Sequence, residues 1–111
     1  MTSATRRQEQ LAAAIAGLER QLTRGVRVAD VRCGDGRALI ELAGAFPVST
    51  FHGFGADPSS VRSARRAAAV AGVSDRVTFE VASGGAIAAE GYDLLVDAEL
   101  VRGVIASRSI R

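Results

Sequence analysis

A glycine-rich turn after a short apolar run is the segment of this chain best suited to binding chemistry. The apolar run ends in Asp30, Gly34 and Gly36 follow at close spacing, and helix-forming residues begin at Ala38. Glycines let backbone N–H groups approach a ligand, and the N-terminus of the following helix adds partial positive charge. This strand–turn–helix layout is typical of nucleotide-binding units and predicts a cofactor site here.

The other residues of the turn change the chemistry of this predicted site. Arg32 stands where such turns carry a glycine, so a bulky cation lies at the expected cofactor position. Cys33 is the only cysteine, which excludes an internal disulfide and a cysteine-based metal cluster; we expect it to be a small, partly buried filler. Asp35 has no second carboxylate or histidine at metal-ligand spacing. We therefore interpret Asp35 as a helix cap or a loop residue and predict no metal site.

Composition sets broad limits on the class of protein. The chain has 111 residues, 48% hydrophobic and 23% charged, which predicts one globular domain over residues 1–111. The net charge is only +2 and the charges are interspersed, so no nucleic-acid partner is expected. No apolar run reaches 18 residues and the start does not resemble a secretory signal, which favours a cytoplasmic protein without a membrane partner. The absence of Lys and Asn beside abundant Ala suggests a GC-rich bacterial genome.

Periodicity and turn residues divide the chain into alternating helices and strands. Apolar residues spaced by three and four predict helices, and alternating or short apolar runs bounded by turn residues predict strands. Asp57 and Pro58 form a helix start, as cap and first helical residue, and Gly25 and Gly72 end helices. The expected helices span residues 5–23, 38–45, 58–71 and 98–106, with one short helical turn through residue 89; the expected strands span residues 26–31, 50–54, 76–81 and 92–97.

Alternation of strand and helix predicts an α/β fold with a parallel sheet and right-handed crossovers. Ligands of such sheets bind at the carboxyl ends of the strands, where the glycine-rich turn lies. The strand at 92–97 contains an apolar run at residues 94–96, which predicts burial on both of its faces.

Four segments in order resemble a class I S-adenosylmethionine-dependent methyltransferase over roughly residues 24–97. Residues 28–36 resemble the family's D-h-G-x-G-x-G loop, and residues 51–54, 75–81 and 91–95 resemble its second, third and fourth strands. The resemblance is greatest to bacterial small-molecule members. It implies a three-layer Rossmann-like parallel sheet with strand order 3-2-1-4, S-adenosyl-L-methionine as cofactor, and a small-molecule methyl acceptor if the chain is active.

The resemblance also implies which residues meet the cofactor. Asp30 would orient its methionine part, and Asp97, at the end of the fourth strand, could face the pocket. The acidic residue that binds the ribose in the family corresponds, without a gap, to Gly55; Asp57 would replace it only if the loop refolds. The adenine-facing position lies near Ser83. The complete set of expected cofactor-binding residues is Asp30, Arg32, Cys33, Gly34, Gly36, Gly55, Asp57, Ser83 and Asp97.

Three of these positions, Arg32, Gly55 and Ser83, depart from the family pattern together. Loss of a ribose-binding carboxylate removes charge-assisted hydrogen bonds of about 1.5–3 kcal/mol. We hypothesise that Arg32 plugs the cofactor site by pairing with Asp30 or Asp57. Cofactor binding would then be impaired.

Class I methyltransferases have seven strands in the order 3-2-1-4-5-7-6, whereas the pattern here stops after the fourth strand and one helix. We therefore expect a truncated domain, its N-terminal half, in which residues 94–96 form a sheet edge that pairs with a second copy or another chain. The helix at 5–23 could partly cover the sheet, although the ordinary helix before the first strand is the favoured interpretation. His52, the only histidine, is expected at the surface or a sheet edge, so no catalytic residue is assigned.

The sequence leaves three functions open. The first is the cofactor-binding half of a methyltransferase with a degenerate site. The second is a non-catalytic relative that serves as an interaction or oligomerisation module, and the third is a fragment with no function of its own. Methyl transfer by this chain unaided is not expected.

Overall fold

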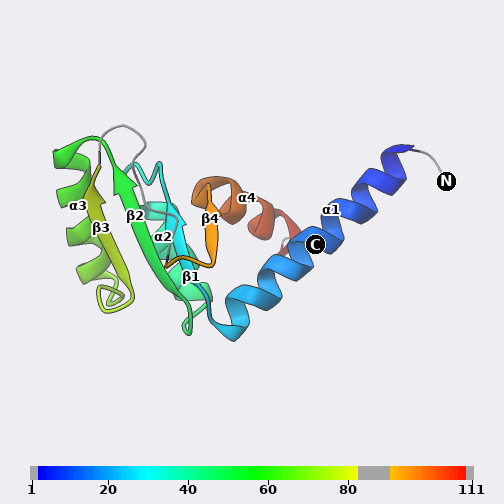
Figure 1. Cartoon of the computed structure of the whole chain (residues 1–111), viewed down its shortest axis with the longest axis horizontal. Coiled ribbons are helices and arrows are strands. Elements are labelled where there is room, and N and C mark those ends of the chain that lie inside the picture. Colours follow the sequence, from blue (N-terminus) through cyan, green and yellow to red (C-terminus); the bar gives the residue numbers. More distant parts are fainter. Residues whose placement is uncertain (1–2, 83–90, 110–111) are drawn as a thin grey trace.

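The structure of the protein is a computed structural model that describes residues 3–82 and 91–109 (Figure 1). These residues form eight helices and strands. The helix predicted through residue 89 and the position at Ser83 lie outside the described residues. In chain order the elements are α1 (Ser3–Arg24), β1 (Arg27–Asp30), α2 (Arg37–Ala45), β2 (Thr50–Gly55), α3 (Pro58–Val70), β3 (Val77–Val81), β4 (Leu94–Val96) and α4 (Ala98–Ser109).

The four strands form one parallel sheet in the order β3-β2-β1-β4. Val28 of β1 lies opposite Phe51 of β2 on one side and Leu94 of β4 on the other. All pairs are parallel because each connection returns the chain to the same end of the sheet. The predicted α/β class and strand order are therefore confirmed.

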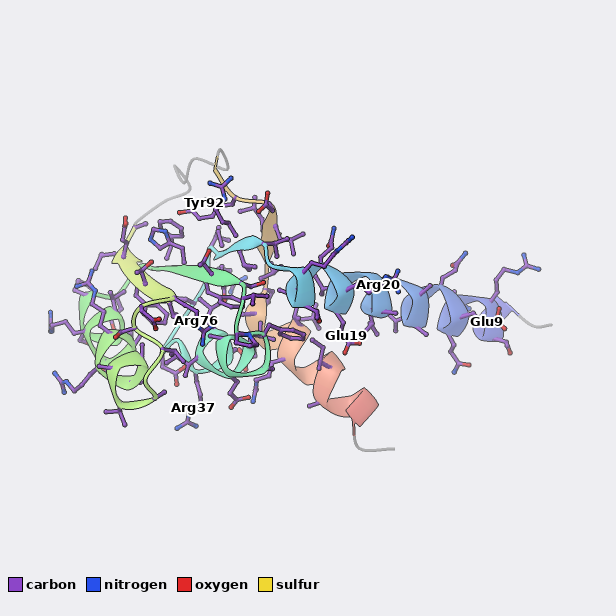
Figure 2. All side chains as sticks on the ribbon, turned by 90° about the horizontal axis from the view of Figure 1, so that it is seen from below. Glu9, Glu19, Arg20, Arg37, Arg76 and Tyr92 are labelled. Carbon is purple, nitrogen blue, oxygen red and sulfur yellow. The ribbon has the colours of Figure 1, made fainter. Side chains whose placement is uncertain are left out.

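Helices α2, α3 and α4 cover one face of this sheet, as both views show (Figures 1 and 2). The core between them and the strands is built from buried apolar side chains, among them Leu39, Phe51, Val61, Val77 and Phe79. In the described part of the chain no helix lies over the opposite face. The end of the sheet with the glycine-rich turn and the bare face are thus two separate surfaces.

The side chains of strand β4 are partly buried on one face of the sheet and exposed on the other. Leu94 and Val96 pack against the core, whereas Leu95 points to the other face and is 55% exposed. The prediction that this strand is buried on both faces is wrong, because successive side chains of a strand point to opposite faces and only one face carries helices.

Helix α1 is anchored at its end and projects from the domain at its start (Figure 1). Leu22 is fully buried, while Leu11 is 58% exposed. The buried hydroxyl of Ser49 donates to Leu22 O at 2.7 Å and accepts from Val26 N at 3.0 Å, which fixes the joint between α1 and β1. The helix runs away from the sheet rather than over it. None of the described helices is both long and apolar enough to cross a membrane.

The beginnings of α2 and α3 follow their sequence signals. Asp57 caps α3 by accepting from Ser59 N at 3.2 Å, as predicted. Gly36 begins α2 with a φ of 77°, a left-handed conformation in which residues other than glycine are strained. A Cβ at Gly36 would lie 2.6 Å from the Phe79 ring and 2.7 Å from Ala64 Cβ. The turn therefore needs glycine for packing as well as for its backbone conformation.

We expect Gly36→Ala to lower the free energy of unfolding by about 3 kcal/mol or more, because overpacking adds to the strain of the left-handed backbone. Gly72→Ala is the control: its φ is 74° but nothing lies within 4 Å of the added Cβ, so it should cost only about 1–2 kcal/mol. Urea unfolding monitored by circular dichroism measures both values. Equal losses in the two variants would show that the close contact with Phe79 is unimportant.

Candidate cofactor-binding site

A cavity of about 370 Å³ opens at the carboxyl end of β1, where the glycine-rich turn meets α2 and α4. Four of the expected cofactor-binding residues, Asp30, Arg32, Cys33 and Gly34, line it. The full lining is Asp30, Arg32, Cys33, Gly34, Asp35, Arg37, Ala38, Glu99 and Arg102. The structure thus brings these four residues together around one space.

Asp30 is a buried carboxylate that holds this end of the sheet together. It is 3% exposed, and its carboxylate accepts from Arg32 N at 2.9 Å and from Ala98 N at 3.3 Å. Burial raises the pKa of Asp30 above its ordinary value, and the two backbone hydrogen bonds oppose that rise. One side chain therefore fixes both the turn and the start of α4.

The turn itself is closed by backbone hydrogen bonds. Gly36 N donates to Cys33 O at 2.8 Å, and Cys33 N donates to Phe54 O at 3.2 Å, which ties the turn to β2. The Asp35 carboxylate accepts from Arg37 N at 3.1 Å, in keeping with its interpretation as a cap or loop residue. At Gly34 the φ is 55° and no atom lies within 4 Å of the Cβ position, so the backbone there faces open space.

Cys33 is the packing residue that the sequence analysis expects. It is 8% exposed, and burial, with a smaller effect from the charge of Asp30, raises the pKa of its thiol to about 11. A thiol that stays protonated at neutral pH is a poor nucleophile and a poor metal ligand. Within the described residues, no group of three or more His, Cys, Asp or Glu side chains could hold a metal ion.

Arg32 lines the cavity with an exposed side chain, but the ion pairs that the plug hypothesis requires are not formed. Its link to Asp30 runs through the backbone N–H, not through the guanidinium. Asp57 is engaged elsewhere, since it accepts from the hydroxyls of Ser59 and Ser60 at 3.1 and 2.8 Å. These hydrogen bonds, with that of Ser60 the strongest, lower the pKa of Asp57. Among the described residues the Arg32 guanidinium therefore forms no ion pair with either carboxylate, although its charge helps to lower the pKa of Asp30 against the effect of burial.

Several other expected site residues lie outside the cavity lining. Asp97 accepts from Glu99 N at 3.1 Å and Leu100 N at 3.2 Å, so it caps α4. Gly55 is buried beside the turn, where an added Cβ would lie 3.2 Å from both Cys33 Sγ and Val61 Cγ2. A carboxylate at position 55 would need a small shift of these neighbours.

The structure adds three charged cavity residues that the sequence did not indicate: Arg37, Glu99 and Arg102. Arg102 Nη1 lies 3.3 Å from Glu41 Oε2, which joins α4 to α2, while its Nε is buried without a hydrogen-bond partner among the described residues. Arg37 follows directly after Gly36, so its position at the start of α2 could have been predicted from the sequence. Residues 99 and 102 are three positions apart, so the sequence places them on one face of a helix. It does not show that this face meets the glycine-rich turn, because that depends on the packing of α4 on α2.

The cavity combines both signs of charge. Arg32, Arg37 and Arg102 supply three cations, and Asp30, Asp35 and Glu99 supply three carboxylates. Such a lining suits a zwitterionic ligand better than a purely anionic or cationic one. The unpartnered Nε of Arg102 is a donor that a bound carboxylate would satisfy.

The position of His52 differs in part from the one that the sequence predicts. It lies on β2, an internal strand between β1 and β3, and its side chain is 19% exposed. The strand order excludes a sheet edge because it places β2 inside the sheet, and His52 is instead half-buried on the face that carries no described helix.

Comparison with known proteins agrees with this geometry. A family model described as a methyltransferase domain matches residues 22–109, which is most of the chain. The chain therefore belongs to the methyltransferase-domain family. No curated protein sequence matches it.

Solved structures of related fold extend the comparison. An RNA methyltransferase from Salinibacter ruber, in complex with S-adenosyl-L-homocysteine, is 25% identical with a TM-score of 0.63, over 78% of this chain and 55% of that one. YjhP from E. coli is 27% identical with a TM-score of 0.61, over 99% of this chain and 43% of that one. The (4+2)-cyclase SpnF is 26% identical with a TM-score of 0.58, over 64% and 26%. The chain thus spans about half or less of the length of these proteins.

The buried carboxylate of Asp30 makes stability depend on pH in a definite direction. Because its folded pKa is raised above the ordinary value of 3.8, the folded state binds more protons between that value and the raised one. The free energy of unfolding of the native chain, relative to Asp30→Asn, should therefore fall as pH rises through this window and then level off. Urea unfolding of both proteins between about pH 3 and 7 measures the difference. A difference that grows with rising pH would contradict this assignment.

Proposed function

We propose that this chain binds S-adenosyl-L-methionine in the cavity at the end of β1, as the cofactor-binding part of a methyltransferase. The observation that carries the proposal is the convergence of Asp30, Cys33 and Gly34 with the N-terminus of α2 around a space of about 370 Å³ with mixed charge. The amino acid part of the cofactor is a zwitterion, and its sulfonium carries a further positive charge. The related RNA methyltransferase was solved with the demethylated form of this cofactor, which supports the proposal.

The cavity residues divide into groups that favour and oppose such a ligand. Arg37 and Arg102 are donors for a carboxylate, and the unpartnered Nε of Arg102 adds one more. Asp35 and Glu99 are acceptors for an ammonium group. Arg32 places a third cation where the family has glycine, so it takes up volume and repels a sulfonium.

Binding should be weaker than a complete site allows, because Gly55 cannot hold a ribose and Asp57 is committed to the start of α3. The cofactor supplies an activated methyl group, and transfer needs chiefly that the acceptor be held close and in line. We infer a small-molecule acceptor from the family resemblance. The remaining length of the related proteins, beyond the part that this chain matches, would supply most contacts to it.

The double variant Arg32→Gly/Gly55→Asp should bind S-adenosyl-L-homocysteine about tenfold more tightly than the native chain, since it removes a steric block and restores a charged hydrogen bond. Isothermal titration calorimetry measures both affinities. Gly44→Asp adds the same charge at an exposed site on α2 with nothing within 4 Å and should leave the affinity unchanged. If neither the native chain nor the double variant binds while both remain folded, the cofactor assignment is wrong.

A second candidate function is that of a non-catalytic interaction module. Within the described residues β4 pairs only with β1, so its outer edge presents free backbone groups beside the exposed Leu95. We propose that a second copy of the chain pairs at this edge and extends the sheet. A two-fold axis would make the two β4 strands antiparallel.

Light scattering after size-exclusion chromatography tests this edge. The native chain should elute as a dimer at tens of micromolar, roughly the range of a small strand interface, and Leu95→Arg should be monomeric. Val70→Arg is the control, since Val70 is 87% exposed on α3, far from β4 along the sheet, and should leave the dimer intact. A native chain that is monomeric at every concentration excludes the edge-paired dimer.

A further inference from the structure

A row of three polar side chains, Glu80, His52 and Tyr92, crosses the bare face of the sheet, away from the cavity at the end of β1. Glu80 comes from β3, His52 from β2, and Tyr92 from the segment that enters β4. Figure 2 shows Tyr92 on the side of the sheet opposite Arg37, which lines the cofactor cavity. Neither the proposed cofactor site nor the open edge of β4 uses these residues.

The contacts define a donor and acceptor for each group. Tyr92 Oη lies 2.5 Å from His52 Nδ1, and His52 Nε2 lies 3.1 Å from Glu80 Oε1. When the phenol donates to Nδ1, the proton of the neutral imidazole must be on Nε2, which faces the carboxylate. Nε2 is buried, and its contact with Glu80 is close but lacks aligned hydrogen-bond geometry. This order of groups, hydroxyl, imidazole and carboxylate, is that of an activated nucleophile.

Ring packing holds the imidazole in place. His52 stacks on Phe54 with ring centroids 4.2 Å apart and planes inclined by 26°. The Tyr92 ring stands edge-on to both, with centroids 5.7 Å from His52 and 6.2 Å from Phe54. Because Phe54 is 7% exposed, it is a firm support for the imidazole.

A cavity of about 180 Å³ lies beside the row of three side chains and could hold a small ligand. His52 and Tyr92 line it, together with Arg27, Thr50 and Thr78. The guanidinium and the two hydroxyls are donors that could stabilise negative charge developing on a reacting oxygen. Arg76 and Asp75 also line the cavity and Glu80 is close, so two guanidinium groups stand against two carboxylates, and this balance favours an uncharged acyl group over a dianionic phosphoryl group.

We propose that Tyr92 is the nucleophile of a second reactive site that accepts the acyl group of a small ester. Tyr92 Oη forms a bond to the carbonyl carbon as its proton moves to His52 Nδ1. The ester C–O bond then breaks, and the leaving alkoxide takes that proton from His52 and departs as an alcohol. Glu80 acts as a positioning residue, because its carboxylate faces Nε2–H while the imidazole carries the extra proton.

The chain is well suited to a direct test, since it contains one tyrosine, one histidine and no lysine. The probe is 4-nitrophenyl acetate. Release of 4-nitrophenol gives the rate, and peptide mass spectrometry locates the acetyl group. The native chain should acetylate Tyr92 about a hundredfold faster than the same chain unfolded in urea, the gain of a positioned general base.

Three variants distinguish the roles of Tyr92, His52 and Glu80. Tyr92→Phe should lose the acetylation, and His52→Gln, which retains a hydrogen-bonding side chain, should react no faster than the unfolded chain. Glu80→Gln, altered at a side chain that is 60% exposed, should lower the maximal rate about tenfold without changing the ester concentration for half-maximal rate, as expected for a group acting through His52. Urea unfolding shows which variants remain folded, and Glu80→Gln keeps the test informative if His52→Gln does not fold.

Three results would overturn the proposal. One is a native rate equal to that of the unfolded chain. Another is a folded His52→Gln or Glu80→Gln variant that reacts at the native rate. The third is rapid nitrophenol release that persists in Tyr92→Phe, which would place the nucleophile on another group.

Discussion

The buried carboxylate of Asp30 is the constraint on which the carboxyl end of the sheet and the glycine-rich turn depend. It ends β1, and by accepting backbone N–H groups from Arg32 and Ala98 it holds the turn and α4 against the same point of the sheet. A carboxylate that is 3% exposed is costly to bury, and these hydrogen bonds offset part of that cost. A carboxylate so engaged is first a structural residue, and the other residues that line the cavity are arranged around it.

Glycine and phenylalanine set the spacing between the turn and the sheet. The Phe79 ring lies where a Cβ would be at both Gly36 and Gly53, so the N-terminus of α2 approaches the strands only because both positions lack a side chain. The turn is therefore constrained by packing even where its ligand chemistry departs from the family. This separation explains how a methyltransferase-domain fold persists around a cavity that contains Arg32 and lacks an acidic residue at Gly55.

The one-sided arrangement of helices divides the molecule into two chemically different surfaces. On the helical side the carboxyl end of β1 opens into a cavity with charges of both signs. On the bare side, His52 of β2 and Tyr92 at the entry to β4 line a smaller cavity, and Glu80 of β3 lies against His52. A parallel sheet is normally covered on both faces, whereas the described residues of this chain place helices on only one.

The amino-acid sequence by itself determined the order and type of the helices and strands, the cap at Asp57 and the turn around Gly34, because these depend on local periodicity and backbone preference. The strand order, too, was predictable from the family resemblance. Only the tertiary structure decided that Arg102 reaches the cofactor cavity, that Leu95 is exposed, and that Tyr92 meets His52 across 40 positions of the chain. Such contacts depend on strand register and on which face each helix covers, and local sequence patterns specify neither.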